Sequence, residues 1–158
     1  MPNKHTLERA RKDKREGKAP TTQAGEFVRE EIEHIREGKH GARSTKQAIA
    51  IGLSKARRAG VDLPPPEKGT TSEKTRKSAA RALKKGKEGA KPDAKRSRAT
   101  TAALKREGRK AASSESLSKQ ARAAAAKRTS AERSAAAKKA AKTRGLSKRS
   151  APARKAAS

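Results

Sequence analysis

The large apolar side chains of this chain lie almost entirely before a run of three prolines, Pro64-Pro65-Pro66. Residues 67–158 contain only four large aliphatic residues beside 25 Ala. Alanine buries too little area to offset the entropy of ordering so long a segment. The prolines cannot continue a helix and favour an extended linker. The pattern predicts a small folded head followed by a tail that has almost no core of its own.

Charge divides at the same place. Residues 1–66 have 15 basic and 9 acidic residues, a net charge of +6, whereas residues 67–158 have 29 basic and 7 acidic residues, a net charge of +22. We therefore expect four regions, which are a charged N-terminal segment (1–20), a helical hairpin head (21–63), a Pro-rich linker (64–69) and a Lys/Arg/Ala-rich low-complexity tail (70–158).

The head carries two helical patterns. Ala24, Phe27, Val28, Ile32 and Ile35 share one helical face; Thr22 is a possible N-cap and Gly38 a possible stop. The second pattern begins with the capping-box sequence Ser44-Thr45-Lys46-Gln47 and ends at Gly60. Together they predict a mostly α fold built on an αα-hairpin, with Val61 and Leu63 closing its open end. A core of this size supplies only a few kcal/mol, so we expect the hairpin to be marginal or dimeric.

The flanking segments give weaker patterns. Residues 4–18 alternate in charge and carry only Leu7 as a sizeable apolar group, which predicts a frayed, solvated helix or none. Residues 118–143 are rich in strong helix formers, but their cations surround the axis and repel one another. We expect the tail to be disordered or partly helical when free, and more helical on a polyanion.

Positive charge at this density predicts binding to nucleic acid, because each phosphate that is neutralised releases a condensed counterion. The chain has one Phe and no Trp or Tyr, which leaves no platform for stacking bases. Contact with the backbone of duplex DNA, largely independent of sequence, is therefore expected. The residues expected to make it are Arg43, Lys46, Arg57, Arg58, Lys84, Lys85, Lys105, Arg106, Lys119, Arg122, Lys127, Arg128, Arg133, Lys138, Lys139, Lys142, Arg144, Lys148 and Arg149.

Two alternatives stay open. Charge alone also permits a protein associated with RNA or the ribosome. Alternatively, the head is an interaction module for a repair or plasmid-partition protein, and the tail tethers it to DNA. A helix-turn-helix is disfavoured, because that motif prefers a turn of about 3–4 residues and needs a third supporting helix.

Other chemistry has little support. We expect no catalytic residues and no cofactor, since no phosphate loop or nucleophile elbow is present. The pair Glu31-x-x-His34 has the spacing used in di-iron bundles, but we expect it to face away from Ile32 and Ile35, with surface pairs such as Arg29–Glu33 explaining the charges. No metal site is therefore predicted. With no Cys, no signal sequence and no apolar run near 20 residues, we expect no membrane partner and a cytoplasmic, nucleoid location.

Two resemblances bear on these expectations. The stretch from Gln23 to Leu53, with Glu26-Phe27-Val28 in its first helix and Ser44-Thr45-Lys46-Gln47 opening its second, resembles a family of small basic bacterial proteins of unknown function. Members of that family are often labelled DNA-binding or plasmid-stabilisation proteins, and the resemblance implies a bacterial source. The tail resembles in composition the Lys/Ala-rich arms of linker histones and of bacterial histone-like proteins.

Overall fold

A computed structural model of the chain describes residues 2–90, 93–138 and 140–141. Its named elements, in chain order, are α1 (Lys4–Arg15), α2 (Pro20–Arg36), α3 (Thr45–Arg58), α4 (Glu73–Lys87), α5 (Ala94–Lys105), the 3-10 turn η1 (Lys110–Ala112) and α6 (Ser114–Ala126). A further helical segment covers residues 130–138. The described residues form no β-strand, and the mostly α fold class is confirmed.

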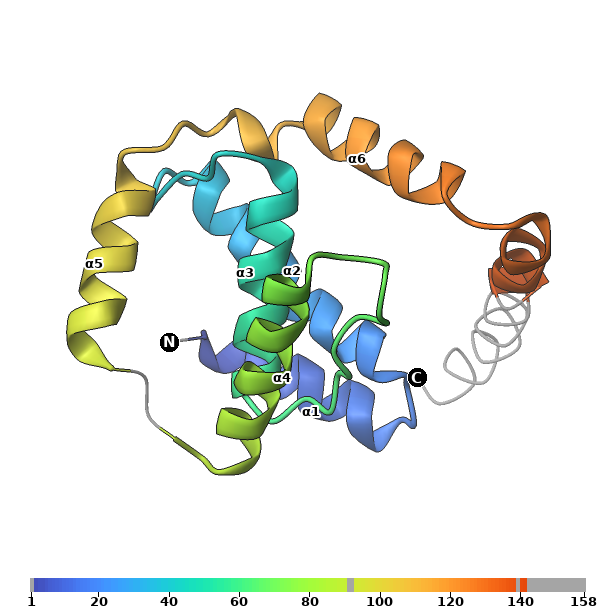
Figure 1. Ribbon diagram of the computed structural model, residues 1–158, viewed down its shortest axis with the longest axis horizontal. Coiled ribbons are helices and arrows are strands. Elements are labelled where there is room, and N and C mark those ends of the chain that lie inside the picture. The colour runs from blue at the N-terminus through green and yellow to red at the C-terminus, as the bar shows by residue number, and fades with distance from the viewer. Residues whose placement is uncertain (1, 91–92, 139, 142–158) are drawn as a thin grey trace, which may run out of the picture. The chain divides into compact units, whose positions relative to one another are not determined.

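The predicted hairpin is α2 packed against α3 (Figure 1). Gly38 follows α2 with a φ of +77°, and Gly60 follows α3 with a φ of +88°, so both predicted stops are confirmed. The hydroxyl of Ser44 caps α3 by accepting from the backbone N–H of Gln47 at 3.2 Å. The start of α2 differs from the prediction, because Ala19 is its N-cap and Pro20 its first residue, which suits a ring with fixed φ and no N–H.

Two small clusters form the core. One joins Ala24 and Phe27 of α2 to Ala56 of α3 and to Val61 and Leu63, which close that end of the hairpin as predicted. The other joins Ile32 and Ile35 of α2 to Ala48 of α3 and to Ala111 and Ala112 of η1. The hairpin alone does not complete either cluster, because residues from outside it cover both.

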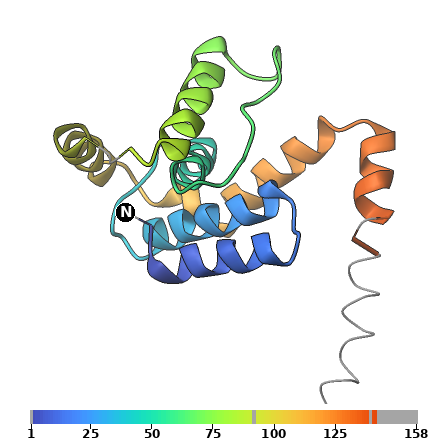
Figure 2. The same cartoon turned by 90° about the horizontal axis from the view of Figure 1, so that it is seen from below.

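The N-terminal segment is one of these covers, and the prediction of a solvated or absent helix there is wrong. Helix α1 packs along α2, as Figure 2 shows, and buries Ala10 against the Phe27 cluster with Leu7 beside it. Arg9 of α1 donates to Glu26 of α2 at 2.5 Å. The apolar face of α1 is narrow and built on alanine, so its pattern in the sequence is weak although its contact is close.

The compact unit extends beyond the predicted head, to Leu117, and a second unit begins at Ser118. Helix α4 packs against α3 and buries Ala79 and Ala82. The crossing is so close that a Cβ on Gly86 would lie 1.9 Å from the carbonyl oxygen of Arg57. Two helices with only small residues between them can approach until their backbones touch, which compensates for the small area of alanine.

Two acidic residues of α2 are also placed differently from the prediction. Arg29 and Glu33 form the expected surface pair at 3.4 Å. Glu31, however, is 1% exposed, so the expectation that it faces away from the core is wrong, and its neighbour Glu30 is likewise buried at 2%. Burial, chiefly, and the nearby Lys55 and Lys39 ammonium groups lower the pKa of His34 on the next turn.

Candidate nucleic-acid interface

Helix α4 carries a stripe of basic residues along one face. Its members are Lys74, Lys77, Arg81, Lys84 and Lys85, all exposed, and we call them the α4 stripe. Spacings of three, four, seven and eleven residues place them together on a helix with 3.6 residues per turn. The buried Ala79 and Ala82 lie on the opposite face, toward α3. The helix therefore presents these five of its seven cations in one direction, away from the core.

Few carboxylates offset the α4 stripe. Lys84 lies 3.8 Å from Glu88, and the other four members have no ion-pair partner within the described ranges. Glu73, in the first turn, is occupied by Arg76, whose guanidinium donates to both carboxylate oxygens at 2.8 and 3.0 Å. Those hydrogen bonds hold the pKa of Glu73 below its usual value. The carboxylate of Glu73 in the first turn of α4 is thus already paired with Arg76, which is not a member of the stripe.

Both ends of α4 are defined by specific interactions. Ser72 caps the helix by accepting from the backbone N–H of Thr75 at 3.2 Å. At the other end Lys87 lies 3.3 Å from Asp62, in addition to the close approach of Gly86 to α3. The packing against α3 and the contacts at the C-terminal end therefore position the basic stripe on the compact unit.

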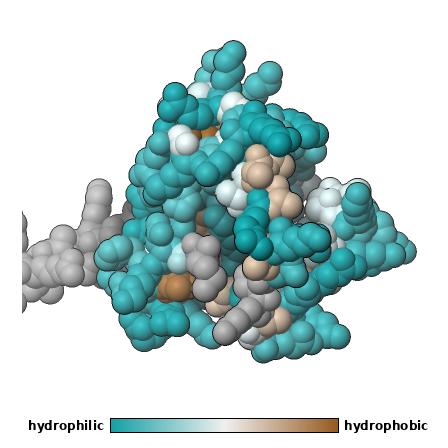
Figure 3. Space-filling view, turned by 90° about the vertical axis from the view of Figure 1, so that its left-hand side faces the viewer, coloured by the Kyte–Doolittle hydropathy of each residue, from teal (hydrophilic) through white to brown (hydrophobic). Residues whose placement is uncertain are grey.

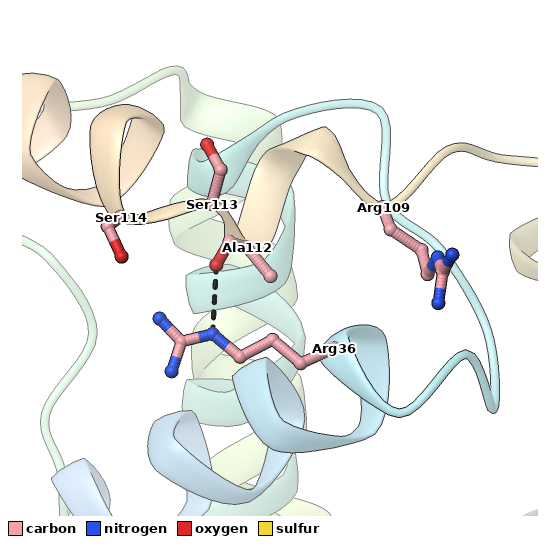
Figure 4. A pocket seen from close by; sticks show the side chains of 5 residues that line it. All are labelled: Arg36, Arg109, Ala112, Ser113 and Ser114. Carbon is pink, nitrogen blue, oxygen red and sulfur yellow. Dashed lines mark hydrogen bonds between the residues drawn. The ribbon is translucent and has the colours of Figure 1, made fainter.

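A second cationic feature is a shallow hollow of about 350 Å³ at the start of α6 (Figure 4). Arg36, Arg109, Ser113 and Ser114 line it together with Ala112, whose carbonyl accepts a hydrogen bond from Nε of Arg36 at 3.0 Å. The Arg36 guanidinium lies near the N-terminus of α6, a position that suits an oxyanion such as a phosphate, whereas the Arg109 side chain points away from it (Figure 4).

Hydrophilic side chains cover most of the face seen in Figure 3, and the apolar residues on it are scattered. Within the described residues no helix is long and apolar enough to cross a bilayer.

The structure places most of the sequence-predicted cations on the surface. Within the compact unit Arg43, Lys46, Arg58, Lys84, Lys85, Lys105 and Arg106 are exposed, and Arg43 lies 3.5 Å from Glu107. In the second unit Lys119, Arg122, Lys127, Arg128, Arg133 and Lys138 are exposed. Five further predicted residues, Lys139, Lys142, Arg144, Lys148 and Arg149, lie outside the described residues.

Arg57 is a correction, because its predicted place on the outer face of α3 is wrong. Its side chain is 6% exposed and donates from Nε to the carbonyl of Leu63 and from a terminal nitrogen to that of Pro64, both at 3.0 Å. Burial lowers the pKa of this guanidinium. Arg57 therefore supports the chain that leaves α3 and is not available to a ligand.

Sequence reasoning missed other residues of the interface. Lys74, Lys77 and Arg81 of the α4 stripe could have been found from their helical spacing, which was available in the sequence. Arg36 and Arg109 are 73 positions apart and line one hollow only because η1 packs against α2. No local pattern in the sequence predicts that these two residues line the same hollow.

The comparisons with known proteins give limited information. No curated protein and no solved structure matches the chain. The model of a family of unknown function (DUF6496) matches residues 11–68. That range contains α2, α3 and part of α1. The hairpin and the last residues of α1 are thus the part of the chain similar to the DUF6496 family, whose function is unknown.

Proposed function

We propose that this protein binds duplex nucleic acid, chiefly DNA, through its phosphate backbone and without sequence preference. The α4 stripe is the observation that carries the proposal, since five exposed cations on one face of an anchored helix match a linear array of phosphates. An ordinary solvated helix tends to intersperse both signs of charge on its exposed face.

Counterion release supplies the driving force. Each phosphate that is neutralised lowers the slope of log K against log salt by about 0.9 for duplex DNA. If all five members of the α4 stripe engage phosphates, they contribute a slope of about −4.5. The hollow lined by Arg36 and Arg109 offers a further phosphate contact, and the exposed cations after Ser118 add to the attraction.

The side chains favour backbone contact over reading of bases. Phe27 is the one aromatic residue of the chain outside its three His, and it is 1% exposed, so it cannot stack on a base. Helix α4 contains no Asn or Gln, the residues that pair bidentately with adenine. Lysine contributes a point charge on a flexible stem, which suits phosphate oxygens of any sequence.

A nucleoid-associated role in a bacterial cell follows from such binding as part of the same proposal. The composition of the tail, like that of histone-like arms, supports it. The labels of DNA-binding and plasmid stabilisation that go with the family resemblance agree with the binding mode but do not identify a partner.

The test compares two triple variants of the full chain that lose equal charge. K77A/R81A/K85A removes three members of the α4 stripe, and R11A/K14A/R15A removes three exposed cations of α1. Binding to a random-sequence DNA duplex is followed by fluorescence anisotropy between about 50 and 200 mM salt. The α4 variant is expected to lower the magnitude of the salt slope by about 2.7, and the α1 control by much less.

Equal effects of the two variants would show that net charge, rather than the α4 stripe, governs binding. Persistent binding at high salt with a sharp sequence preference would contradict the proposal itself. Competition by double-stranded RNA as effective as that of DNA would assign the interface to duplexes in general.

A further inference from the structure

A buried group of ionisable side chains lies where α2 meets the loop that leads to α3. Glu31 and His34 come from α2, and His40 comes from the loop. One ligand atom from each, a carboxylate oxygen and two ring nitrogens, lies within 4.8 Å of the others. The two imidazole rings meet edge to face with their centroids 6.1 Å apart. We call these three residues the Glu-His cluster.

Glu31 has one oxygen occupied and one free. Its Oε2 accepts from the Lys55 ammonium group. Its Oε1 lies 3.2 Å from Nε2 of His40, yet it is buried and has no hydrogen-bond partner among the described residues. Such an orphaned carboxylate oxygen is costly, because it has lost its water without gaining a donor.

The neighbouring Glu30 is a second buried carboxylate next to Glu31. Its Oε1 accepts from the backbone N–H of Asn3 at 3.1 Å and lies 3.7 Å from Nε2 of His34, while its Oε2 is likewise buried and without a partner in the described part of the chain. Of these two buried carboxylates only Glu31 is paired with an ammonium group, that of Lys55. The Lys39 ammonium group, which is also near His34, lies 2.7 Å from Glu37 and is paired there. One negative charge is left over, and it requires either a proton or a cation.

His40 is oriented in a way that favours a cation. Its Nδ1 lies 3.0 Å from the carbonyl oxygen of Gly41, and a carbonyl can only accept, so Nδ1 carries a hydrogen. In the neutral ring the lone pair is then on Nε2, the nitrogen near Oε1 of Glu31. A backbone carbonyl that fixes the tautomer in this way is the usual support of a metal-binding histidine.

We propose that the Glu-His cluster binds a divalent transition-metal ion of the Zn²⁺ class. Zinc takes His nitrogen and carboxylate oxygen at about 2.0–2.2 Å, so two ligands of a tetrahedral ion lie about 3.3 Å apart. The separation of 3.2 Å between Oε1 of Glu31 and Nε2 of His40 matches that edge. A ring nitrogen of His34 lies within 4.8 Å of both other ligand atoms, so we assign it as the third ligand.

The donor set selects the kind of metal. Two imidazoles and one carboxylate suit zinc and the neighbouring first-row ions, whereas magnesium and calcium prefer oxygen donors alone. Of the Glu-His cluster, His40 also lines a hollow of about 830 Å³, together with residues of the α2–α3 loop and of the chain from the end of α5 to η1.

Metal binding would act on the fold as well as on charge. It ties α2 to the loop before α3, and the same loop donates from Gly41 to the carbonyl of Leu104 and from Ala42 to that of Gly108. An ion that binds only the folded chain raises its stability by mass action.

The test uses the full chain, freed of metal by a chelator, and titrates it with Zn²⁺ alone by calorimetry. We expect one ion per chain, a melting temperature that rises until one equivalent is added, and a Co²⁺ complex with visible absorption bands. His34→Ala and His40→Ala are each expected to weaken Zn²⁺ binding by about 100-fold or more. The matched control is His5→Ala, which removes the remaining histidine, an exposed one 3.6 Å from Glu8, and is expected to change nothing.

A second variant covers the case in which a histidine variant fails to fold. Glu31→Gln keeps the shape of the side chain and should lose Zn²⁺ binding while its helical circular dichroism stays. If the unaltered chain binds Zn²⁺ no better than the H34A/H40A double variant, or if His5→Ala weakens binding as much as His40→Ala, the proposal is wrong. In that case a proton on His40, visible by NMR, neutralises the Glu-His cluster.

Discussion

The close crossing of α2 and α3 predicts that a Gly→Ala substitution has opposite effects on stability at two sites. Gly52 lies in the middle of α3, and a Cβ built on it would lie 2.6 Å from Cα of Val28 and 2.9 Å from its backbone nitrogen. Gly25 lies inside α2, and a Cβ there would meet nothing within 4 Å. Both are helical, so Gly→Ala changes the backbone entropy of both in the same way.

The magnitudes follow from that geometry. Alanine is favoured over glycine inside a helix by about 1 kcal/mol, so Gly25→Ala should stabilise the protein by about 0.5–1 kcal/mol. At Gly52 the new methyl group needs about 3.5–4.0 Å, so the helices must separate by about 1 Å. Overpacking of that kind costs about 1–3 kcal/mol. Because the propensity contributions cancel, the difference between the two variants isolates the packing cost.

The assay is thermal denaturation followed by far-ultraviolet circular dichroism, since the chain has no Trp or Tyr to report by fluorescence. For a unit of this size 1 kcal/mol corresponds to about 4 °C in Tm, so the two variants should differ by about 4–12 °C, with Gly25→Ala the more stable. Equal increases in Tm would refute the reasoning, because they would mean that α2 and α3 do not approach so closely.

Two further predictions concern single side chains. Arg57→Met keeps the aliphatic stem but leaves the carbonyls of Leu63 and Pro64 without their donor, so urea denaturation should show a loss of about 1–3 kcal/mol. The exposed neighbour provides the control, because Arg58→Met should stay within about 0.5 kcal/mol, and similar losses at both sites would contradict the burial of Arg57. The backbone N–H and hydroxyl of Thr129 donate to Oε2 of Glu132 at 2.7 and 3.0 Å, and these bonds lower the pKa of Glu132. This start of the helical segment 130–138 is therefore fully stabilised above the ordinary glutamate pKa and loses that stabilisation as pH falls through the lowered one. An NMR titration should show a midpoint below the ordinary value, and Thr129→Ala should move it part of the way back up, because the variant loses the hydroxyl but keeps the backbone N–H.

Features decided by neighbours in the chain could be predicted closely. The two hairpin helices, the Ser44 cap and the stops at Gly38 and Gly60 depend on interactions that span a few residues. Even here the reciprocal half of the capping box is shifted by one position, because the Gln47 side chain accepts from the N–H of Arg43 at 2.7 Å and not from that of Ser44.

Features decided by distant partners could not be predicted. Helical spacing indicated that α2 has an apolar face, but not that Glu31 would meet Lys55 and His40, because the positions of those residues depend on how α3 and its loop return. Arg57 looked like any exposed cation of α3 until the chain after it placed two carbonyls on its guanidinium.

The sequence by itself determined a small hairpin core, a mostly helical chain and a positive charge concentrated after the prolines. The tertiary structure alone decided which helices cover that core and which cations and carboxylates are buried. The physical reason is that alanine and glycine carry little hydrophobic signal along the chain. They nevertheless let α1 and α4 approach α2 and α3 closely. Only the packing of α4 against α3 directs the cations of the α4 stripe away from the core on one face.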